Sequence, residues 1–306
     1  MLVFQVKDIF FQALHPATVF FYLGVVILGA VALNHPLFLL ALFVPILLVL
    51  AASDGLETWL KSVRFFVFFI AILLLINTLV NQLGETVLLW GPALPVLGRV
   101  VVSLENLVFS LVMGIRLLTV FTAFILYNQL VNPDRALSMF ARLFPRSALL
   151  IALTTKTIPF LSQKLQRAAE IAQCRGVNFY TGGRFARVKN RLPLVRVLFM
   201  SSLEDSFNIG ESIQARAYGS GPRTTYFRQR VRPGDVLVTT AAAAAFLLML
   251  LSLLQGWGSF AFYPRLGEWI VSRHQWAALL GTWGFLMIPV IPAWGWKKWD
   301  FFRWRM

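Results

Sequence analysis

Six long apolar stretches limit what this sequence can fold into. A helix needs about 20 apolar residues to cross roughly 30 Å of hydrocarbon. The stretches that approach or reach this length are 17–34, 36–53, 64–83, 104–127, 235–256 and 276–296. Apolar residues make up 58% of the chain and charged residues only 13%, unlike the composition of soluble domains. The sequence therefore predicts an all-α polytopic membrane protein with about six transmembrane helices and two long cytoplasmic helices.

The apolar stretches divide the chain into three regions. We expect N-terminal transmembrane helices in residues 1–133, a cytoplasmic region in 134–232, and C-terminal transmembrane helices with a basic tail in 233–306. The first two stretches are separated only by Asn34-His35-Pro36. Such a short break predicts a helical hairpin or a partly re-entrant segment.

The positive charge is unevenly distributed along the chain. The net charge is +15, and with the N-terminus inside, the inner segments hold 24 of the 28 Lys and Arg residues. The short flanking segments support this orientation by the positive-inside rule, so both termini and residues 134–232 are expected in the cytoplasm. A basic face on a membrane protein usually meets anionic lipid. Because no nucleic-acid recognition module is visible, we expect no nucleic-acid partner.

An amphipathic helix is expected in the first half of the basic segment, after Pro145 and Pro159. Apolar residues recur there at helical spacing, and Gly176 supplies a helix stop because glycine takes the left-handed conformation at little cost. The helix face is formed by Ile158, Leu161, Leu165, Ala168 and Ala172, and the end reads Ala172-Gln173-Cys174-Arg175-Gly176. Residues 177–191 are polar and predicted to form a loop.

A second helix is expected at about 194–217, restarting at Pro193. It ends with Gln214-Ala215-Arg216-Ala217-Tyr218-Gly219, and we expect Gly219 and Gly221-Pro222 to stop it. Small residues recur every four positions at Ser202, Ser206 and Gly210, a pattern that lets helices approach closely in membranes. The same device, an amphipathic helix followed by an Arg and a stop, thus occurs twice.

The two arginines, Arg175 and Arg216, allow two interpretations. A cation near a helix C-terminus complements the helix dipole, an effect of about 0.3–1 kcal/mol. Alternatively, each guanidinium docks into an acidic groove on a soluble partner and binds a carboxylate with two hydrogen bonds. The duplication on one segment favours docking.

These residues resemble the transmembrane T component of energy-coupling factor transporters, the EcfT/CbiQ family. Its two Ala-Arg-Gly-type motifs correspond to Cys174-Arg175-Gly176 and Ala215-Arg216-Ala217. Cys174 replaces the usual Ala and Ala217 the usual Gly, so the need for glycine in the second motif is open. Further similar segments are Asn34-His35-Pro36-Leu37, Ile115-Arg116-Leu117, Ile158-Pro159-Phe160-Leu161, Ser212-Ile213-Gln214-Ala215-Arg216 and Pro222-Arg223-Thr224.

The resemblance implies a non-enzymatic scaffold in a prokaryotic inner membrane. It would hold two cytoplasmic ABC-type ATPases and a small membrane-embedded substrate-binding S component, for uptake of a vitamin or a transition-metal ion. The implied ATPase-docking residues are Ala172, Cys174, Arg175, Gly176, Ala215, Arg216, Ala217, Tyr218 and Gly219. Ser202, Ser206 and Gly210 are the implied S-component contacts.

The remaining candidate residues point to no catalytic or metal site. The three histidines, His15, His35 and His274, lack metal-ligand spacing. Arg116 lies inside a predicted span, which marks a functional candidate, although a structural role with Asn77 or Asn81 is preferred. Adjacent Glu204 and Asp205 point in different directions on a helix, so they balance the basic face or contact a neighbouring helix. We expect no cofactor, no metal and no catalytic residue.

Three other classes of membrane protein fit the sequence less well. A self-contained secondary transporter should show an internal repeat of its spans, but the duplication here is cytoplasmic. A membrane enzyme should cluster His, Asp or Glu at one membrane face, and the sequence shows no such cluster. An ordinary ABC permease subunit would lack the paired Arg motifs.

Overall fold

The computed structural model describes residues 9–80, 85–94, 98–141, 144–177, 179, 183–221, 231–267 and 272–298. The chain divides into two compact units. Unit 1 comprises Met1–Ala136 with Gln229–Met306, and unit 2 comprises Leu137–Arg228. Helices make up most of both units, which confirms the predicted all-α class.

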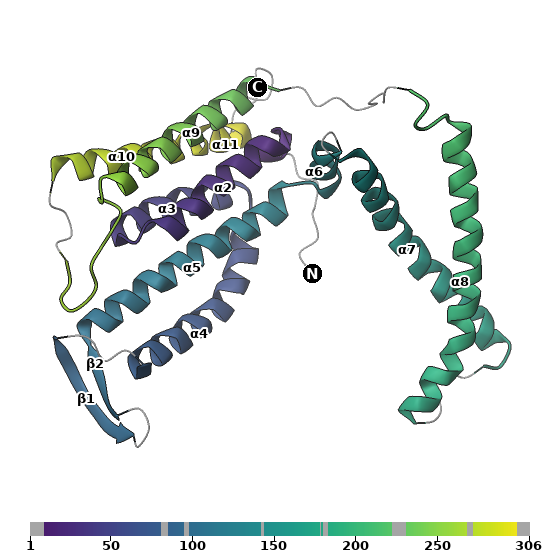
Figure 1. Ribbon diagram of the computed structural model, residues 1–306, viewed down its shortest axis with the longest axis horizontal. Coiled ribbons are helices and arrows are strands. Elements are labelled where there is room, and N and C mark those ends of the chain that lie inside the picture. Colours follow the sequence, from purple (N-terminus) through teal and green to yellow (C-terminus); the bar gives the residue numbers. More distant parts are fainter. Residues whose placement is uncertain are drawn as a thin grey trace. The chain divides into compact units, whose positions relative to one another are not determined.

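Unit 1 is a bundle of apolar helices that run side by side (Figure 1). Its helices are α1 (Phe10–Ala13), α2 (Pro16–Ala32), α3 (Pro36–Ala52), α4 (Leu56–Val80), α5 (Leu104–Leu130), α9 (Pro233–Leu254), α10 (Arg273–Met287) and α11 (Val290–Lys298). Among the described residues, four segments are long and apolar enough to cross a membrane: Leu56–Asn77, Leu104–Leu130, Pro233–Leu254 and Arg273–Trp296. The shorter α2 and α3 are also apolar, with 17 residues each. These six segments confirm a polytopic membrane protein.

Two histidines begin the first two apolar helices. His15 and His35 are the N-caps of α2 and α3, and their Nδ1 atoms accept hydrogen bonds from the backbone N–H groups of Ala17 (3.2 Å) and Leu37 (3.3 Å). Proline follows each histidine at the first helical position, where its fixed φ suits a helix start. The His-Pro pairs are therefore helix starts.

The connection between α2 and α3 is held by the segment that follows α9. The N–H groups of Asn34 and His35 both donate to the carbonyl of Gly258, at 2.8 and 3.1 Å, just after α9. The rings of Phe260 and His35 lie 5.4 Å apart, which places the segment after α9 over the hairpin tip. Close packing also joins the helices, since the Gly29 Cα faces the Met249 side chain of α9.

A second set of hydrogen bonds lies at the other end of the bundle, away from the α2–α3 connection, where α2 and α9 begin. Buried Asp235 accepts the N–H of His15 at 2.6 Å and that of Arg232 at 2.7 Å, so one carboxylate joins the starts of α2 and α9. Gln129 of α5 donates to the Ser53 carbonyl, and Gln12 donates to the Gln129 carbonyl at 2.9 Å. Polar groups at this end of unit 1 are thus satisfied within the chain, as low-dielectric surroundings require.

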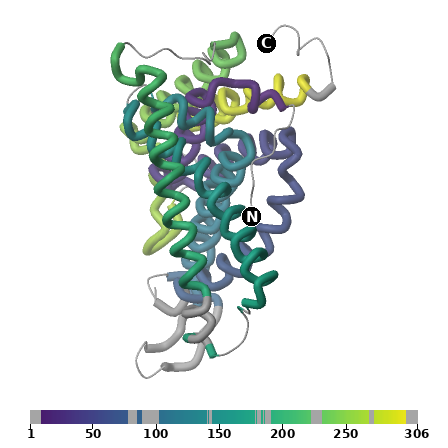
Figure 2. The backbone as a smooth tube through the Cα atoms, turned by 90° about the vertical axis from the view of Figure 1, so that its right-hand side faces the viewer, coloured from purple at the N-terminus to yellow at the C-terminus, as the bar shows by residue number. Residues whose placement is uncertain are grey.

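Helix α4 lies at one edge of unit 1 (Figure 2). It packs against α5 and a neighbouring strand. Ile70 lies beside Gly114, and the rings of Phe66 and Phe121 are 3.6 Å apart. Many of its other large apolar side chains are exposed, among them Phe65, Phe68, Leu75 and Ile76. An apolar surface of this kind is what a lipid-facing helix presents.

A two-stranded hairpin precedes α5 and was not predicted. Strands β1 (Val87–Leu94) and β2 (Gly98–Ser103) pair antiparallel, with Val87 opposite Ser103 and Leu94 opposite Gly98. The segment just before β1 anchors this hairpin, because Thr86 donates to the Glu105 carboxylate of α5 at 2.5 Å (Oγ1) and 3.2 Å (N).

Unit 2 is dominated by two long helices. They are α7 (Pro145–Cys174) and α8 (Arg184–Ala215), which cross one another (Figure 1). The short α6 (Pro133–Phe140) precedes them, and the boundary between the two units falls within it. Helix α8 begins ten residues earlier than predicted and contains Pro193, while α7 runs through Pro159. Both helices are mostly exposed, so water can satisfy the carbonyl that each proline leaves unbonded. The predicted loop at 177–191 was therefore too long.

Candidate functional site

The end of α7 is a Schellman motif with Arg175 as its C-cap. The N–H of Val177 donates to the Ala172 carbonyl at 3.0 Å, and that of Gly176 donates to the Gln173 carbonyl at 2.9 Å. Gly176 has a φ of +84°. These are the two hydrogen bonds and the left-handed residue that define this motif, so the predicted stop at Gly176 is confirmed.

The end of α8 repeats this geometry around Arg216. Tyr218 N–H donates to the Ile213 carbonyl at 3.2 Å, and Ala217 N–H donates to the Gln214 carbonyl at 2.9 Å. The C-cap backbone angles agree closely: φ −86°, ψ 10° at Arg175 and φ −83°, ψ 11° at Arg216.

The stop of α8 was predicted two residues too late. Ala217, with φ +52°, takes the left-handed position that was expected at Gly219, and Gly219 (φ +95°) follows in the same turn. A left-handed alanine is disfavoured by its Cβ. The hydrogen bonds of the motif and the following glycine turn hold it in place, which settles that glycine is not needed in the second motif to form this helix end.

Both arginine side chains are exposed and available for binding. Within the described residues, neither guanidinium has a hydrogen bond or ion pair. Backbone N–H groups already satisfy the carbonyls that a Schellman motif covers. The arginines are therefore not needed as hydrogen-bonding caps, although their charges still complement the helix dipoles.

The crossing of α7 and α8 places the two ends symmetrically. Lys164 of α7 contacts Asp205 of α8 with Nζ and Oδ2 2.5 Å apart. Lys164 lies 11 residues before Arg175, and Asp205 lies 11 residues before Arg216. Each arginine is therefore about 16 Å along its helix from the crossing, at 1.5 Å per residue. The two residues that meet at the crossing are 41 positions apart, and so are the two arginines at the helix ends.

From the sequence, Lys164 was not identified as a contact residue, and Asp205 was assigned two possible roles without a partner. Asp205 was expected to balance the basic face or to contact a neighbouring helix, and its ion pair with α7 does both. Glu204 beside it is exposed. The spacing of 41 residues between Asp205 and Lys164, equal to that between the arginines, was the available signal for the pair.

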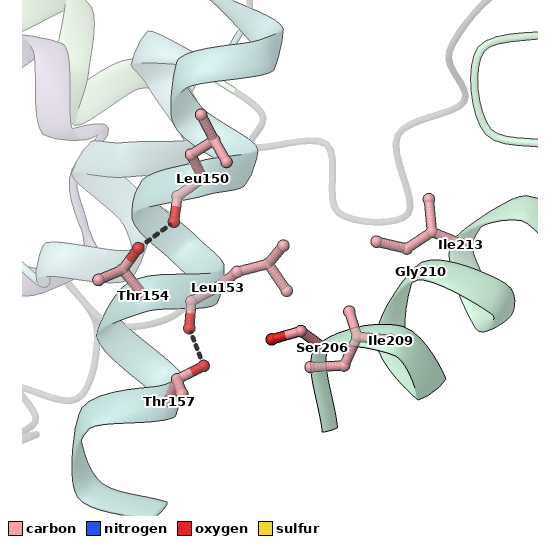
Figure 3. A pocket seen from close by; sticks show the side chains of 8 residues that line it. All are labelled: Leu150, Leu153, Thr154, Thr157, Ser206, Ile209, Gly210 and Ile213. Carbon is pink, nitrogen blue, oxygen red and sulfur yellow. Dashed lines mark hydrogen bonds between the residues drawn. The ribbon is translucent and has the colours of Figure 1, made fainter. Parts of the chain in front are cut away.

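Two of the three predicted small residues line a groove between α7 and α8. This groove, with a volume of about 400 Å³, lies between the first half of α7 and the last part of α8 (Figure 3). Its lining residues are Leu150, Leu153, Thr154, Thr157, Ser206, Ile209, Gly210 and Ile213. Ser202 is not among them, and its hydroxyl donates to the Phe199 carbonyl at 2.8 Å. At Gly210 an added Cβ would meet nothing within 4 Å, so α8 is not closely packed there.

Arg116, the other predicted site residue, lies in unit 1 and holds the tip of the α2–α3 hairpin. Its Nη2 donates to the Leu33 carbonyl at 2.9 Å and to Asn34 Oδ1 at 2.6 Å. Asn77, suggested as its partner, instead donates to Ser110 at 2.8 Å, and Asn81 lies outside the described residues. The contacts of Arg116 favour the structural interpretation.

The fold and these helix ends define a class of protein: a polytopic membrane protein with two exposed, Arg-capped helices in a separate unit. Residues 11–227 match the family model CbiQ, described as a cobalt transport protein. The chain belongs to the CbiQ/EcfT family, the non-catalytic transmembrane components of energy-coupling factor transporters. This membership argues against the secondary-transporter and ordinary-permease alternatives.

Individual relatives agree with the family. The transmembrane protein EcfT 1 of Listeria monocytogenes is 24% identical over 68% of this chain and 79% of its own length. EcfT of Heliobacterium modesticaldum is 30% identical over 34% of this chain, and the match spans only 40% of that relative. A third relative, from Bifidobacterium longum, is by name an ABC transporter ATP-binding protein. It is 25% identical over 70% of this chain, which spans 28% of that protein.

Proposed function

We propose that this chain is the scaffold that couples two cytoplasmic ATPases to a membrane-embedded substrate-binding S component. The observation that carries the proposal is the repeated helix end: Arg175 and Arg216 have the same backbone geometry and stand equally far from one crossing. Two equivalent contact points suit a pair of similar subunits related by a two-fold axis. The match to a relative named as an ATP-binding protein also supports ATPase partners.

Each docking surface would consist of a helix end with its arginine. We assign Ala172, Cys174, Arg175 and Gly176 to one ATPase, and Ala215, Arg216, Ala217, Tyr218 and Gly219 to the other. The exposed guanidinium can bind a carboxylate with two hydrogen bonds. The Schellman turn fixes the arginine backbone, so less conformational entropy is lost on docking.

The membrane-embedded partner would contact α8 through Ser202, Ser206 and Gly210. The exposure of Ser206 and Gly210 supports this assignment. The cargo would be a vitamin or a transition-metal ion chosen by the S component. We also propose that both termini and residues 134–232 are cytoplasmic, because ATP is available on that side and the basic residues concentrate there.

The test is co-purification of the chain with its ATPases, using the double variant Arg175→Ala/Arg216→Ala. We expect the ATPases to be lost while the chain still inserts into the membrane. The matched control is Arg167→Ala/Arg196→Ala, which removes two exposed arginines from the same two helices. If the first variant retained its ATPases as well as the control does, the docking proposal would be wrong.

A further inference from the structure

Lys164 makes an unusually complete set of contacts at the crossing of α7 and α8. Its ammonium group donates to Asp205 Oδ2 at 2.5 Å and to Ser201 Oγ at 2.8 Å, and lies 4.7 Å from the centre of the Phe160 ring. An ammonium has three N–H donors. One side chain of α7 thus contacts two residues of α8, one turn apart, and is steadied by an aromatic ring of its own helix.

The Lys164–Asp205 contact is partly shielded from solvent. The side chains of Lys164 and Asp205 are 26% and 32% exposed. Fully exposed ion pairs contribute little to stability, but an ion pair that also bonds a hydroxyl fixes a geometry more firmly than an isolated pair does. The described residues of α7 and α8 form no other ion pair with one another.

Away from the crossing the two helices separate. The groove residues of α7, Leu150 to Thr157, precede Lys164, and those of α8, Ser206 to Ile213, follow Asp205. The side chains on the two walls lie apart in Figure 3. Because this side is open, side-chain packing does not fix the angle between the helices there.

We infer that Lys164 is a positioning residue: its contacts with Asp205 and Ser201 form the pivot about which α7 and α8 turn, and so set the separation of Arg175 and Arg216. This inference rests on the proposed function. With arms of about 16 Å, a rotation of 10° changes the separation of the arginines by at most about 3 Å, the arc that one arm sweeps. Small hinge and shear motions of rigid helices have this size.

A pivot at Lys164 requires the width of the groove and the separation of Arg175 and Arg216 to change in opposite directions. Helix α7 is continuous from Pro145 to Cys174, so its two halves move in opposite directions about Lys164. When Leu153 approaches Ile209 and the groove closes, Arg175 moves away from Arg216. When the ATPases draw the arginines together, the groove opens.

The experiment measures both distances in the full chain by pulsed electron–electron resonance. In a Cys174→Ala background, Glu170→Cys and Glu211→Cys carry spin labels on the last turns of α7 and α8. Both positions are exposed, lie six residues beyond Lys164 and Asp205, and stand outside the docking residues. In the same background, Leu153→Cys and Ile209→Cys report on the groove. We expect one narrow distance between 170 and 211, and a broad distribution in Lys164→Ala and in Asp205→Ala. The charge-swapped pair Lys164→Asp/Asp205→Lys should restore the narrow distance. Glu204→Ala, which removes a neighbouring exposed acid, should leave it unchanged.

Two results would overturn the pivot. One is an unchanged 170–211 distribution in both Lys164→Ala and the milder Lys164→Gln. The other is movement of the two distances in the same direction when ATPases and nucleotide are added. The first measurement needs no ATPase, so it separates failure of the pivot from failure of the docking proposal, which the co-purification reports. In the complex that contains Lys164→Ala, we expect the bound ATPases to keep hydrolysing ATP while transport per ATP is lost.

Discussion

Gly176 and Ala217 occupy the same position in two helix ends, both left-handed, with φ values of +84° and +52°. Each donates its N–H to a carbonyl three residues back, at 2.9 Å. One position is filled by the residue that suits it and the other by a residue that pays a conformational penalty. The difference between them can be measured.

Ala217→Gly is expected to stabilise the end of α8 by about 1 kcal/mol, because glycine removes the Cβ strain of the left-handed conformation. Gly176→Ala should destabilise the end of α7 by a similar amount, and since an added Cβ meets nothing within 4 Å, the cost is conformational only. Hydrogen exchange followed by mass spectrometry at Val177 and Tyr218 checks both. Equal exchange at Tyr218 before and after Ala217→Gly would show that the alanine is not strained.

Arg116→Leu should lower the stability of unit 1 by about 1–3 kcal/mol, because it leaves the carbonyl of buried Leu33 without its donor and also removes the hydrogen bond to Asn34 Oδ1. Replacing both side chains, in Arg116→Leu/Asn34→Leu, should recover part of this loss, since apolar partners need no hydrogen bond. Thermal unfolding in detergent measures both variants. A stable Arg116→Leu protein that has lost transport would instead identify Arg116 as a functional residue.

Asp235→Ala should destabilise the protein by roughly 2–4 kcal/mol, because the N–H groups of His15 and Arg232 both lose a charged acceptor. Asp235→Asn keeps one carbonyl oxygen, so its stability should lie between those of the unchanged protein and Asp235→Ala. The control is Asp134→Ala at the exposed start of α6, where only a helix-dipole effect below about 1 kcal/mol is expected. Unfolding in mixed detergent ranks the three variants, and equal losses at the two sites would contradict a role for Asp235 in joining α2 to α9.

Gly29→Ala should cost about 1–3 kcal/mol, because the new Cβ would lie 2.8 Å from the Met249 sulfur and 3.1 Å from a Leu42 methyl. Gly24→Ala in the same helix meets nothing within 4 Å and should be neutral or stabilising. Thermal unfolding compares them. Adding Met249→Ala to Gly29→Ala should be less damaging than the sum of the single changes; simple additivity would argue against close packing of α2 on α9.

Local patterns in the sequence were enough to predict the apolar helices and the two Arg-capped ends. Span length, helical spacing and Gly176 are properties of neighbouring residues, and the structure keeps them. The start of α8 at Arg184 was missed because Pro193 was taken as a restart, although an exposed helix tolerates an internal proline.

What could not be predicted depends on contacts between distant residues. Lys164 and Asp205 lie 41 residues apart, so no local pattern identifies their contact, and only the equal spacing of the two arginines points to it. Likewise, the pairing of β1 and β2 is anchored through Thr86 to Glu105 at the start of α5. The hydrogen bonds of Arg116 to the α2–α3 connection arise only when the bundle forms.

The position of α4 at the edge of unit 1 makes the surrounding lipid part of the architecture. Protein covers one side of this helix, while its remaining aromatic and aliphatic side chains face outward. The 22 residues of Leu56–Asn77 are long and apolar enough to cross the hydrocarbon core. Because neighbouring protein holds α4 on one side only, we expect a change in bilayer thickness to act on this protein first through α4.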